Sequence, residues 1–224
     1  MRKVYEGKTK QVFENEKGNL VMQFKDDVTG TGEEIDPGGN EVVGQVSGKG
    51  RSSLSLTVHF FELLKQNNIP THYISADLNR STMEVKKGQT LGLEIVCRLK
   101  AYGSFLRRYP DKVKAMQDLN YLVEFTVKDD ERGDPLINED ALQVLGVLAA
   151  EEIVKVKRVT RSVGEILENH LTDKGLTLVD FKLEFGRVHG DIVIIDEISG
   201  DGMRVFRGSE PLSQKALAEE ILTN

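Results

Sequence analysis

The sequence predicts an α+β fold built mostly from antiparallel sheets. Strand-like segments occur in groups and do not alternate regularly with helices, which argues against a doubly wound parallel sheet. Two helical patterns separate these groups, and a long strand hairpin follows the second of them. The 224 residues are enough for one large domain or for two smaller lobes.

The first half of the chain is predicted to begin with a strand meander. Residues 27–50 contain seven glycines with little apolar pattern between them, which predicts a long loop that is mobile or ordered by a ligand. Ser52 or Ser53 would then cap a helix that runs to about Asn67. The meander strands are expected at residues 4–5, 11–13 and 20–24.

The second half is predicted to continue with strands and then two helices. Gly175 would end the longer helix, and a short amphipathic helix would close the chain at residues 213–222. Further strands are expected at residues 72–75, 83–85, 91–99 and 121–127, and helices at residues 105–109, from residue 140 onward and from about 151 to 171.

A predicted hairpin at residues 176–198 carries charged side chains on apolar strands. Because side chains alternate along a strand, Asp180, Lys182 and Glu184 share one face. Burying such groups is costly unless something binds them. A divalent metal together with a nucleotide phosphate would bind them. The simpler alternative is that this face of the hairpin is exposed to solvent. A loop centred on Gly190 would place Asp196 opposite Glu184. A two-residue loop at residues 189–190 would instead place it opposite residue 183.

Composition excludes several classes of function. The net charge of −6 and the pI of about 5.4 argue against nucleic-acid binding. No apolar run approaches the roughly 20 residues that span a bilayer, and the first residues do not form a signal peptide. The single cysteine, Cys97, fits a reducing cytoplasm. The four histidines lack the spacing of a zinc site.

Two short motifs suggest phosphate binding. In residues 5–10 a glycine in a strand turn lets the backbone approach a phosphate, and two lysines add charge. In residues 97–104, Arg98 supplies a fork that matches phosphate, and Ser104 stands where a helix cap would stand. Ordinary surface lysines and a plain helix cap are the alternatives. Residues 48–52 fail as a Walker A loop because Arg51 separates the lysine from the serine.

Together and in this order, these stretches resemble the SAICAR synthetase (phosphoribosylaminoimidazole-succinocarboxamide synthase) family. The block at residues 180–186, Asp-Phe-Lys-Leu-Glu-Phe-Gly, is the most specific match. The other matching positions are residues 5–10, residues 69–72, Arg98 with residues 101–104, Lys128 with Asp130, residues 134–135, and residues 196–197 with Asp201 and Arg204.

The resemblance implies a two-lobed fold distantly like those of kinases and ATP-grasp enzymes. Residues 1–85 would form an ATP-binding lobe of mainly antiparallel sheet with one helix. Residues 86–224 would form a larger α+β lobe with the substrate and metal sites. The implied reaction joins L-aspartate to carboxyaminoimidazole ribonucleotide through an acyl phosphate, consuming ATP with Mg²⁺ in de novo purine biosynthesis. The resemblance also implies a homodimer.

The family's functional residues transfer to this chain only where its motifs match. The implied roles are nucleotide binding by Gly7, Lys8, Lys10 and Lys86, magnesium binding by Glu184 and Asp196, substrate binding by Arg98, Ser104, Asp201 and Arg204, and contact with the reacting groups by Asp180, Lys182, Lys128 and Asp134.

Some positions depart from the family's pattern, and they leave alternatives open. Ser52 and Ser53 stand where the family has two asparagines, and Leu99 stands where the family has a further asparagine. Gly200 replaces a proline, and the C-terminal tail lacks a usual charged motif. A paralogous ATP-dependent amide-forming ligase with a different carboxylate acceptor is one alternative, and a non-catalytic nucleotide-binding relative is another.

Overall fold

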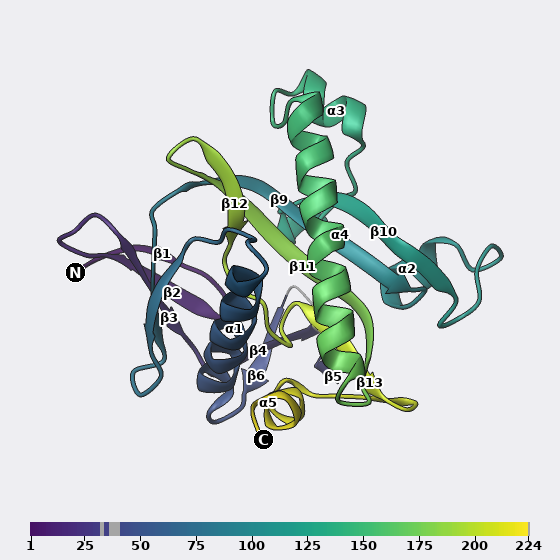
Figure 1. Cartoon of the computed structure of the whole chain (residues 1–224), viewed down its shortest axis with the longest axis horizontal. Coiled ribbons are helices and arrows are strands. Elements are labelled where there is room, and N and C mark those ends of the chain that lie inside the picture. The colour runs from purple at the N-terminus through teal and green to yellow at the C-terminus, as the bar shows by residue number, and fades with distance from the viewer. Residues whose placement is uncertain (32–33, 36–40, 224) are drawn as a thin grey trace. The chain divides into compact units, whose positions relative to one another are not determined.

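The computed structural model describes residues 1–31, 34–35 and 41–223 (Figure 1). It divides into two compact units. Unit 1 comprises residues 1–91, 184–202 and 213–224, and unit 2 comprises residues 92–183 and 203–212. The α+β class with antiparallel sheets is confirmed. The functional boundary at residues 85 and 86 stays a prediction; the compact units separate at residue 91, and unit 1 includes two later segments.

Unit 1 contains the predicted meander, extended into a five-stranded antiparallel sheet. The expected strands near the N-terminus are confirmed; the first two are longer than predicted, and the third has its predicted bounds. Lys10 begins the second strand and pairs with Phe24 on the third. In spatial order the sheet consists of β1 (Arg2–Glu6), β2 (Lys10–Glu14), β3 (Leu20–Phe24), β8 (Thr82–Val85) and β7 (Tyr73–Asp77).

The prediction of a loop over residues 27–50 was wrong for its described part. Strands β4 (Asp27–Thr31), β5 (Glu34–Ile35) and β6 (Glu41–Gln45) form a small antiparallel sheet there. The Gln45 amide donates a 2.7 Å hydrogen bond to Asp27 directly across the sheet. Glycines lower strand propensity, but cross-strand pairing overrides it. Residues 32–33 and 36–40 of the predicted loop lie outside the described residues.

Helix α1 (Lys49–Gln66) begins earlier than predicted, and neither serine caps it. Gly48 is the N-cap residue, in the left-handed conformation (φ 77°). The Asp26 carboxylate accepts hydrogen bonds from the backbone N–H groups of Gly48 and Gly50, at 3.0 and 2.9 Å. An acidic side chain from another segment therefore satisfies the free amides at this helix start.

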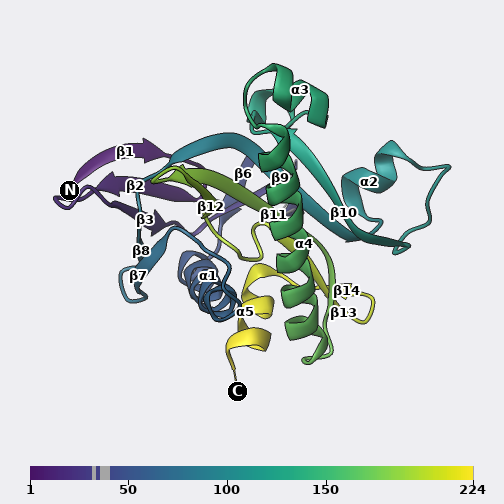
Figure 2. The ribbon, with the colours of Figure 1, turned by 45° about the horizontal axis from the view of Figure 1, so that its top comes forward.

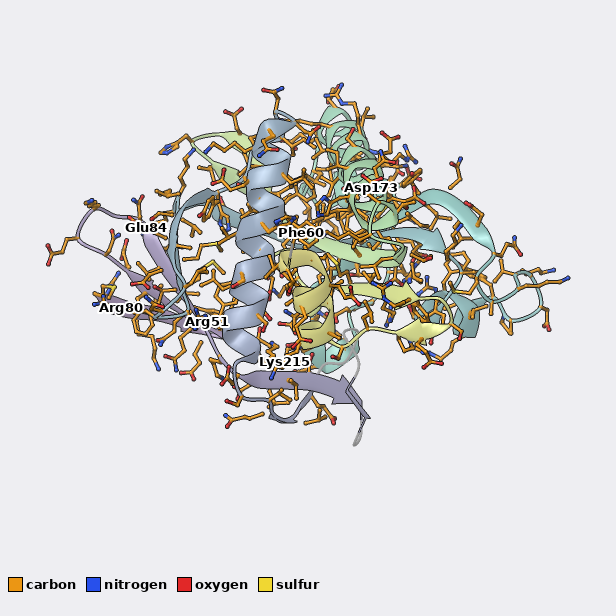
Figure 3. All side chains as sticks on the ribbon, turned by 60° about the horizontal axis from the view of Figure 1, so that its bottom comes forward. Arg51, Phe60, Arg80, Glu84, Asp173 and Lys215 are labelled. Carbon is orange, nitrogen blue, oxygen red and sulfur yellow. The ribbon has the colours of Figure 1, made fainter. Side chains whose placement is uncertain are left out.

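The C-terminal helix α5 (Gln214–Leu222) packs beside α1 in unit 1 (Figure 1). It begins one residue later than predicted and ends where predicted, and Ser213 caps it by accepting a hydrogen bond from the backbone of Ala216. Side chains on the two faces of α1 differ in environment. Phe60 is buried, whereas Arg51 near the start of the helix is exposed (Figure 3).

The predicted hairpin consists of β11 (Thr177–Val188) and β12 (Asp191–Ile195). Val188 pairs with Asp191 and Glu184 with Ile195, so a two-residue turn joins the strands. This is the register in which a regular continuation would place Asp196 opposite residue 183. Strand β12 ends at Ile195, however, and Asp196 adopts a left-handed conformation (φ 65°). The strand pleat therefore does not set the direction of the Asp196 side chain.

Unit 2 is built on a sheet with the strand order β10-β9-β11-β13-β14. Strands β9 (Gln89–Lys100) and β10 (Asp118–Val127) pair antiparallel, as do β11 and β13 (Met203–Arg207). The first residues of β9 and the last residues of β11 belong to unit 1. Strands β13 and β14 (Glu210–Pro211) were not predicted, because both are short and β13 carries two arginines.

The helices of unit 2 largely follow the sequence-based expectation. Helix α4 (Ala150–Thr172) packs against β10 and carries the short helix α3 (Glu139–Val144) at its start (Figure 2). Helix α2 (Gly103–Arg108) begins after Tyr102, and the predicted cap at Ser104 was wrong, since that residue lies inside the first turn. The Ser104 hydroxyl instead accepts hydrogen bonds from arginine side chains.

Candidate active site

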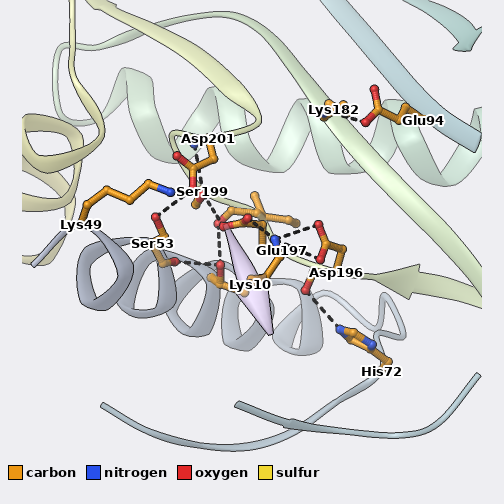
Figure 4. Close-up of polar contacts among 12 residues, drawn as sticks. Lys10, Lys49, Ser53, His72, Glu94, Lys182, Asp196, Glu197, Ser199 and Asp201 are labelled. Atoms are coloured by element: carbon orange, nitrogen blue, oxygen red, sulfur yellow. Dashed lines mark hydrogen bonds and ion pairs between the residues drawn. The ribbon is translucent and has the colours of Figure 1, made fainter. Parts of the chain in front are cut away.

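Lys10 is the centre of a charged group in unit 1, which we call the lysine cluster (Lys10, Lys49, Asp196, Glu197 and Asp201). The Lys10 ammonium lies 3.1 Å from the Asp196 carboxylate and is also ion-paired with Glu197 (Figure 4). Burial lowers the pKa of Lys10, but these two carboxylates outweigh it and raise the pKa above its ordinary value. Lys10 is therefore fully charged at neutral pH, although its side chain is largely buried.

The second half of the lysine cluster ties helix α1 to the turn after β12. Lys49 is only 1% exposed, and its ammonium is ion-paired with Asp201. The Ser53 hydroxyl donates a 3.1 Å hydrogen bond to the same carboxylate. Burial and the nearby Glu197 raise the pKa of Asp201, against the effect of Lys49. Asp201, predicted to bind substrate, is thus engaged with residues of its own unit.

Ser199 links the two halves of the lysine cluster. Its hydroxyl donates a 2.6 Å hydrogen bond to Glu197 and accepts one from the backbone of Asp201 at 3.1 Å. Two lysines here face three carboxylates, so the group carries an excess of negative charge while Asp201 is ionised. Such an excess favours a cation.

The predicted magnesium ligands, Glu184 and Asp196, both belong to unit 1. Glu184 is buried and pairs with Ile195, the residue before Asp196. Among the described residues, no group of three or more His, Cys, Asp or Glu side chains is arranged to hold a metal ion. Magnesium commonly binds through one or two carboxylates together with substrate phosphates, so the two carboxylates of the predicted site are of a chemical type that fits this ion.

The other residues predicted to bind nucleotide lie at the ends of strands in the unit 1 sheet. Gly7 and Lys8 form the turn between β1 and β2, and the backbone N–H of Gly7 donates to the carbonyl of Lys10 at 2.8 Å. Lys86 is exposed and directly follows β8; its backbone N–H donates to the carbonyl of His72. Residues 7, 8, 10 and 86 thus belong to neighbouring parts of one sheet.

Arg98 is the centre of a second charged group, in unit 2. We call it the arginine cluster (Arg98, Arg108, Arg204, Glu124 and Asp180). The buried Arg98 guanidinium donates to Glu124 at 2.5 Å, to Asp180 at 3.2 Å and to the Ser104 hydroxyl at 3.0 Å. Three separate nitrogens make these bonds, so the plane of the guanidinium is fixed.

Two further arginines complete the arginine cluster. Arg204 donates to Asp180 at 2.9 Å, and Arg108 donates to Glu124 at 2.5 Å and to Ser104 at 3.3 Å. Three arginines therefore surround two carboxylates, which leaves an excess of positive charge and favours an anion. The structure brings together four predicted residues here: Arg98, Ser104, Asp180 and Arg204.

The remaining residues predicted to contact the reacting groups lie elsewhere in unit 2. Lys182 donates a 2.7 Å hydrogen bond to Glu94 on β9 (Figure 4). Lys128 directly follows β10, where its backbone N–H donates to the carbonyl of Gly92 at 3.0 Å. Asp134 has a left-handed backbone (φ 50°) and accepts a 2.8 Å hydrogen bond from the backbone of Asp129.

Several residues of the two clusters were not among the predicted site residues. Glu197 adjoins the predicted magnesium ligand Asp196, and Lys49 stands in the stretch that fails as a Walker A loop. Arg108 and Glu124 carry no motif of their own. Glu124 stands within an apolar strand and Arg108 follows another arginine, and neither pattern alone distinguishes a functional residue from a surface residue.

Comparison with known proteins identifies the family. A family model described as SAICAR synthetase matches residues 3–220. The chain belongs to the SAICAR synthetase family. A phosphoribosylaminoimidazole-succinocarboxamide synthase of Clostridium tetani (strain Massachusetts / E88) is 46% identical, covering 99% of this chain and 100% of the relative. One of Aquifex aeolicus (strain VF5) is 38% identical, covering 92% of each chain.

Solved structures of the family share this fold. A type-2 SAICAR synthetase in complex with ADP superposes with a TM-score of 0.88 at 34% identity, covering 99% of this chain and 98% of that one. The synthase from Ehrlichia chaffeensis gives a TM-score of 0.89 at 26% identity, covering 100% and 99%. In the part of the chain that the structure describes, no helix has the length and apolar character to span a membrane.

Proposed function

We propose that the chain joins L-aspartate to carboxyaminoimidazole ribonucleotide through an acyl phosphate, giving SAICAR, ADP and phosphate. SAICAR synthase activity in purine biosynthesis follows from the full-length similarity to the family's synthases. The structural observation that supports the route is the pair of clusters with opposite charge excess, one suited to a cation with nucleotide and one suited to a phosphate.

The chemistry explains why ATP is consumed. A carboxylate does not react with an amine, because its charge repels the nucleophile and oxide is a poor leaving group. Transfer of the terminal phosphoryl group of ATP to a carboxylate oxygen releases ADP and forms the acyl phosphate. The aspartate amine then attacks the acyl carbon, phosphate leaves, and the amine loses a proton. The enzyme's contribution is mainly positioning and neutralisation of charge.

In the proposed arrangement, unit 1 binds the nucleotide. Gly7, Lys8 and Lys10 would hold its phosphates, and Lys86 would lie near the adenine. Mg²⁺ would be held by Glu184 and Asp196, and when bound it supplies charge neutralisation at the transferred phosphoryl group. Lys10 is ion-paired with Asp196, and its own charge is secured by its two carboxylate partners.

Unit 2 would bind the ribonucleotide. Arg98, Ser104 and Arg204 would hold its phosphate, which suits the positive excess of the arginine cluster. Asp180 orients both of these arginines through its two oxygens. Lys182, Lys128 and Asp134 would face the reacting groups, and Asp201 would act from unit 1 by holding the turn that follows Asp196.

The experiment that tests this proposal is ADP release by the purified chain with Mg-ATP and L-aspartate, with and without carboxyaminoimidazole ribonucleotide. Release that requires all three substrates supports the proposal. Mg-ATP binding without ADP release would favour a ligase with an acceptor other than this ribonucleotide. Absence of nucleotide binding would contradict both the proposed reaction and that alternative ligase. Glu184→Gln and Asp196→Asn should abolish release because each removes an anionic magnesium ligand. The exposed Glu210→Gln serves as the matched control.

Two coarser expectations accompany the proposal. We expect a homodimer, as the family resemblance implies, and sedimentation equilibrium of the purified chain tests it. We also expect a cytoplasmic enzyme, which is where its single free cysteine would stay reduced.

A further inference from the structure

We propose that His72 is a positioning residue, whose imidazole holds the backbone of Asp196 in the conformation that directs its carboxylate to Lys10. The inference rests on the proposed role of Asp196 in nucleotide and magnesium binding. Three observations carry it: the backbone conformation of Asp196, the partner of its carbonyl group, and the segment that holds His72 in place.

Asp196 has an unusual backbone for a residue with a side chain. Its φ of 65° lies in the left-handed region, which non-glycine residues adopt at a cost. Strand β12 has just ended at Ile195, so the pairing of the hairpin no longer holds the carbonyl group of Asp196. A strained residue persists only when its surroundings fix it, and such residues concentrate at functional sites.

The imidazole of His72 supplies the partner for that carbonyl. Its Nε2 lies 3.2 Å from the Asp196 carbonyl oxygen (Figure 4). Because a carbonyl oxygen only accepts hydrogen bonds, Nε2 carries the proton. Burial lowers the pKa of His72 to about 4, so the ring is neutral at physiological pH. The neutral ring has one N–H donor, at Nε2.

Residues 70–72 are themselves attached to the end of β12. The backbone N–H of His72 donates to the carbonyl of Ile194 at 3.0 Å, and Thr71 forms a parallel bridge with Ile194. The ring of Phe61 meets the imidazole edge-on, with centroids 5.9 Å apart and planes at 84°. Backbone pairing thus fixes where His72 stands, and Phe61 fixes how its ring is turned.

These contacts connect a helix of the core to the charged centre. Phe61 on α1 orients His72, His72 fixes the Asp196 backbone, and the Asp196 carboxylate meets Lys10 at 3.1 Å. Outer partners of this kind orient metal ligands, and their loss typically lowers metal affinity or activity by roughly tenfold to a hundredfold. A histidine that served only to pack the core would not need its N–H group directed at the carbonyl of a residue with a strained backbone.

Two substitutions separate the hydrogen bond from the packing. His72→Gln retains an N–H donor at nearly the reach of Nε2, whereas His72→Phe retains the ring and its contact with Phe61 but has no donor. The exposed turn residue His189, with a left-handed backbone of its own, provides the control His189→Asn. Circular dichroism and urea unfolding establish that each variant is folded.

The decisive readout is ATP binding by calorimetry with excess Mg²⁺ and with EDTA, alongside the Mg²⁺ dependence of ADP release. We expect His72→Phe to lose roughly tenfold or more of the magnesium-dependent gain in ATP affinity while binding in EDTA is unchanged. His72→Gln should keep most of that gain, and His189→Asn all of it.

Other outcomes overturn the inference in distinct ways. If the magnesium dependence of ATP binding is unchanged in His72→Phe, His72 does not position Asp196. If both His72 variants lose ATP affinity equally with and without Mg²⁺, His72 contributes only packing. If His72→Phe does not fold, His72→Asn replaces it, because its shorter amide does not reach the carbonyl; equal behaviour of Asn and Gln then counts against the inference. If the unmodified chain shows no magnesium-dependent ATP binding, it is the proposed function that fails.

Discussion

Lys10 and Asp196 stand 186 residues apart in the chain and 3.1 Å apart in the structure. Lys10 begins β2, and Asp196 follows β12, so the contact joins the N-terminal sheet to the hairpin within unit 1. Lys10 also pairs with Glu197, and its ammonium is largely buried. The stability of unit 1 and its proposed nucleotide site therefore share the same side chain.

Replacing Lys10 with methionine should impair both properties. Removing one partner of a buried ion pair leaves uncompensated charge and typically costs about 3–5 kcal/mol of unfolding free energy. We expect a loss of that order in urea unfolding, together with loss of ADP release. Lys3→Met is the control, because the solvent-exposed pair of Lys3 with Glu6 should contribute little to stability. Equal stability of the two variants would contradict a buried, coupled Lys10.

Lys49 and Asp201 form a second buried ion pair, and a double-mutant cycle can isolate it. Lys49→Met should destabilise the chain by about 3–5 kcal/mol in urea unfolding near neutral pH, since it leaves the buried Asp201 carboxylate unpaired. Asp201→Asn should cost less, because burial and Glu197 already favour the neutral form of this side chain. The combined variant should lose clearly less than the sum, because no unpaired charge remains. Additive losses would show that the two residues act independently.

Protonation offers a second view of this pair. Burial and Glu197 raise the pKa of Asp201 in the folded chain, so protonation stabilises the fold relative to the unfolded chain. That contribution is complete below the unfolded pKa and is lost as pH rises through the folded pKa. Asp201→Asn should therefore flatten the decline of stability with rising pH in mildly acidic solution, as followed by urea unfolding at a series of pH values.

The sequence predicted the strands better than it predicted how the site residues are held. Alternation and turn residues located the meander and the hairpin, because these patterns are local. The strands between residues 27 and 45 were missed because the glycines among them weaken the strand pattern. Asp180, Arg98 and Arg204 were each chosen from a motif, yet their direct ion pairs depend on strand register across β9, β11 and β13.

The cap of α1 shows the same limit for a helix. Ser52 and Ser53 are good capping residues by type, but Asp26 takes that role from another segment. Their hydroxyls bond elsewhere, Ser52 to the carbonyl of Gly48 and Ser53 to Asp201. Ser53 thus makes a polar contact with the lysine cluster, which no local pattern could reveal.

Arg98→Ala should affect the two substrates unequally. Arg98 holds Ser104 and orients Asp180 in unit 2, whereas the proposed nucleotide residues belong to unit 1. We expect the KM for the ribonucleotide to rise far more than the KM for ATP, by roughly tenfold to a hundredfold if one charge-assisted contact worth about 1.5–3 kcal/mol is lost. Lys100→Ala, on the same strand but paired at the surface with Asp118, is the control. Equal rises in both KM values would show that Arg98 does not bind the phosphate of the ribonucleotide.

Gly50 and Gly48 provide a matched test of close packing at the start of α1. A Cβ on Gly50 would lie 2.8 Å from the carbonyl oxygens of Phe24 and Lys25, both of which are backbone atoms that cannot yield as a side-chain end would. A Cβ on Gly48 would meet nothing within 4 Å, and only its left-handed φ of 77° is unfavourable.

Gly50→Ala should therefore destabilise the chain more than Gly48→Ala does. An alanine at residue 48 adds conformational strain of about 1–2 kcal/mol. An alanine at residue 50 instead displaces the backbone after β3 and shifts the neighbouring Lys49, and overpacking of this kind costs about 1–3 kcal/mol or more. Urea unfolding measures the difference, and ADP release should fall only in Gly50→Ala, since that substitution moves the Lys49–Asp201 contact. If Gly48→Ala were the more damaging of the two, backbone strain and not close approach would determine how α1 begins.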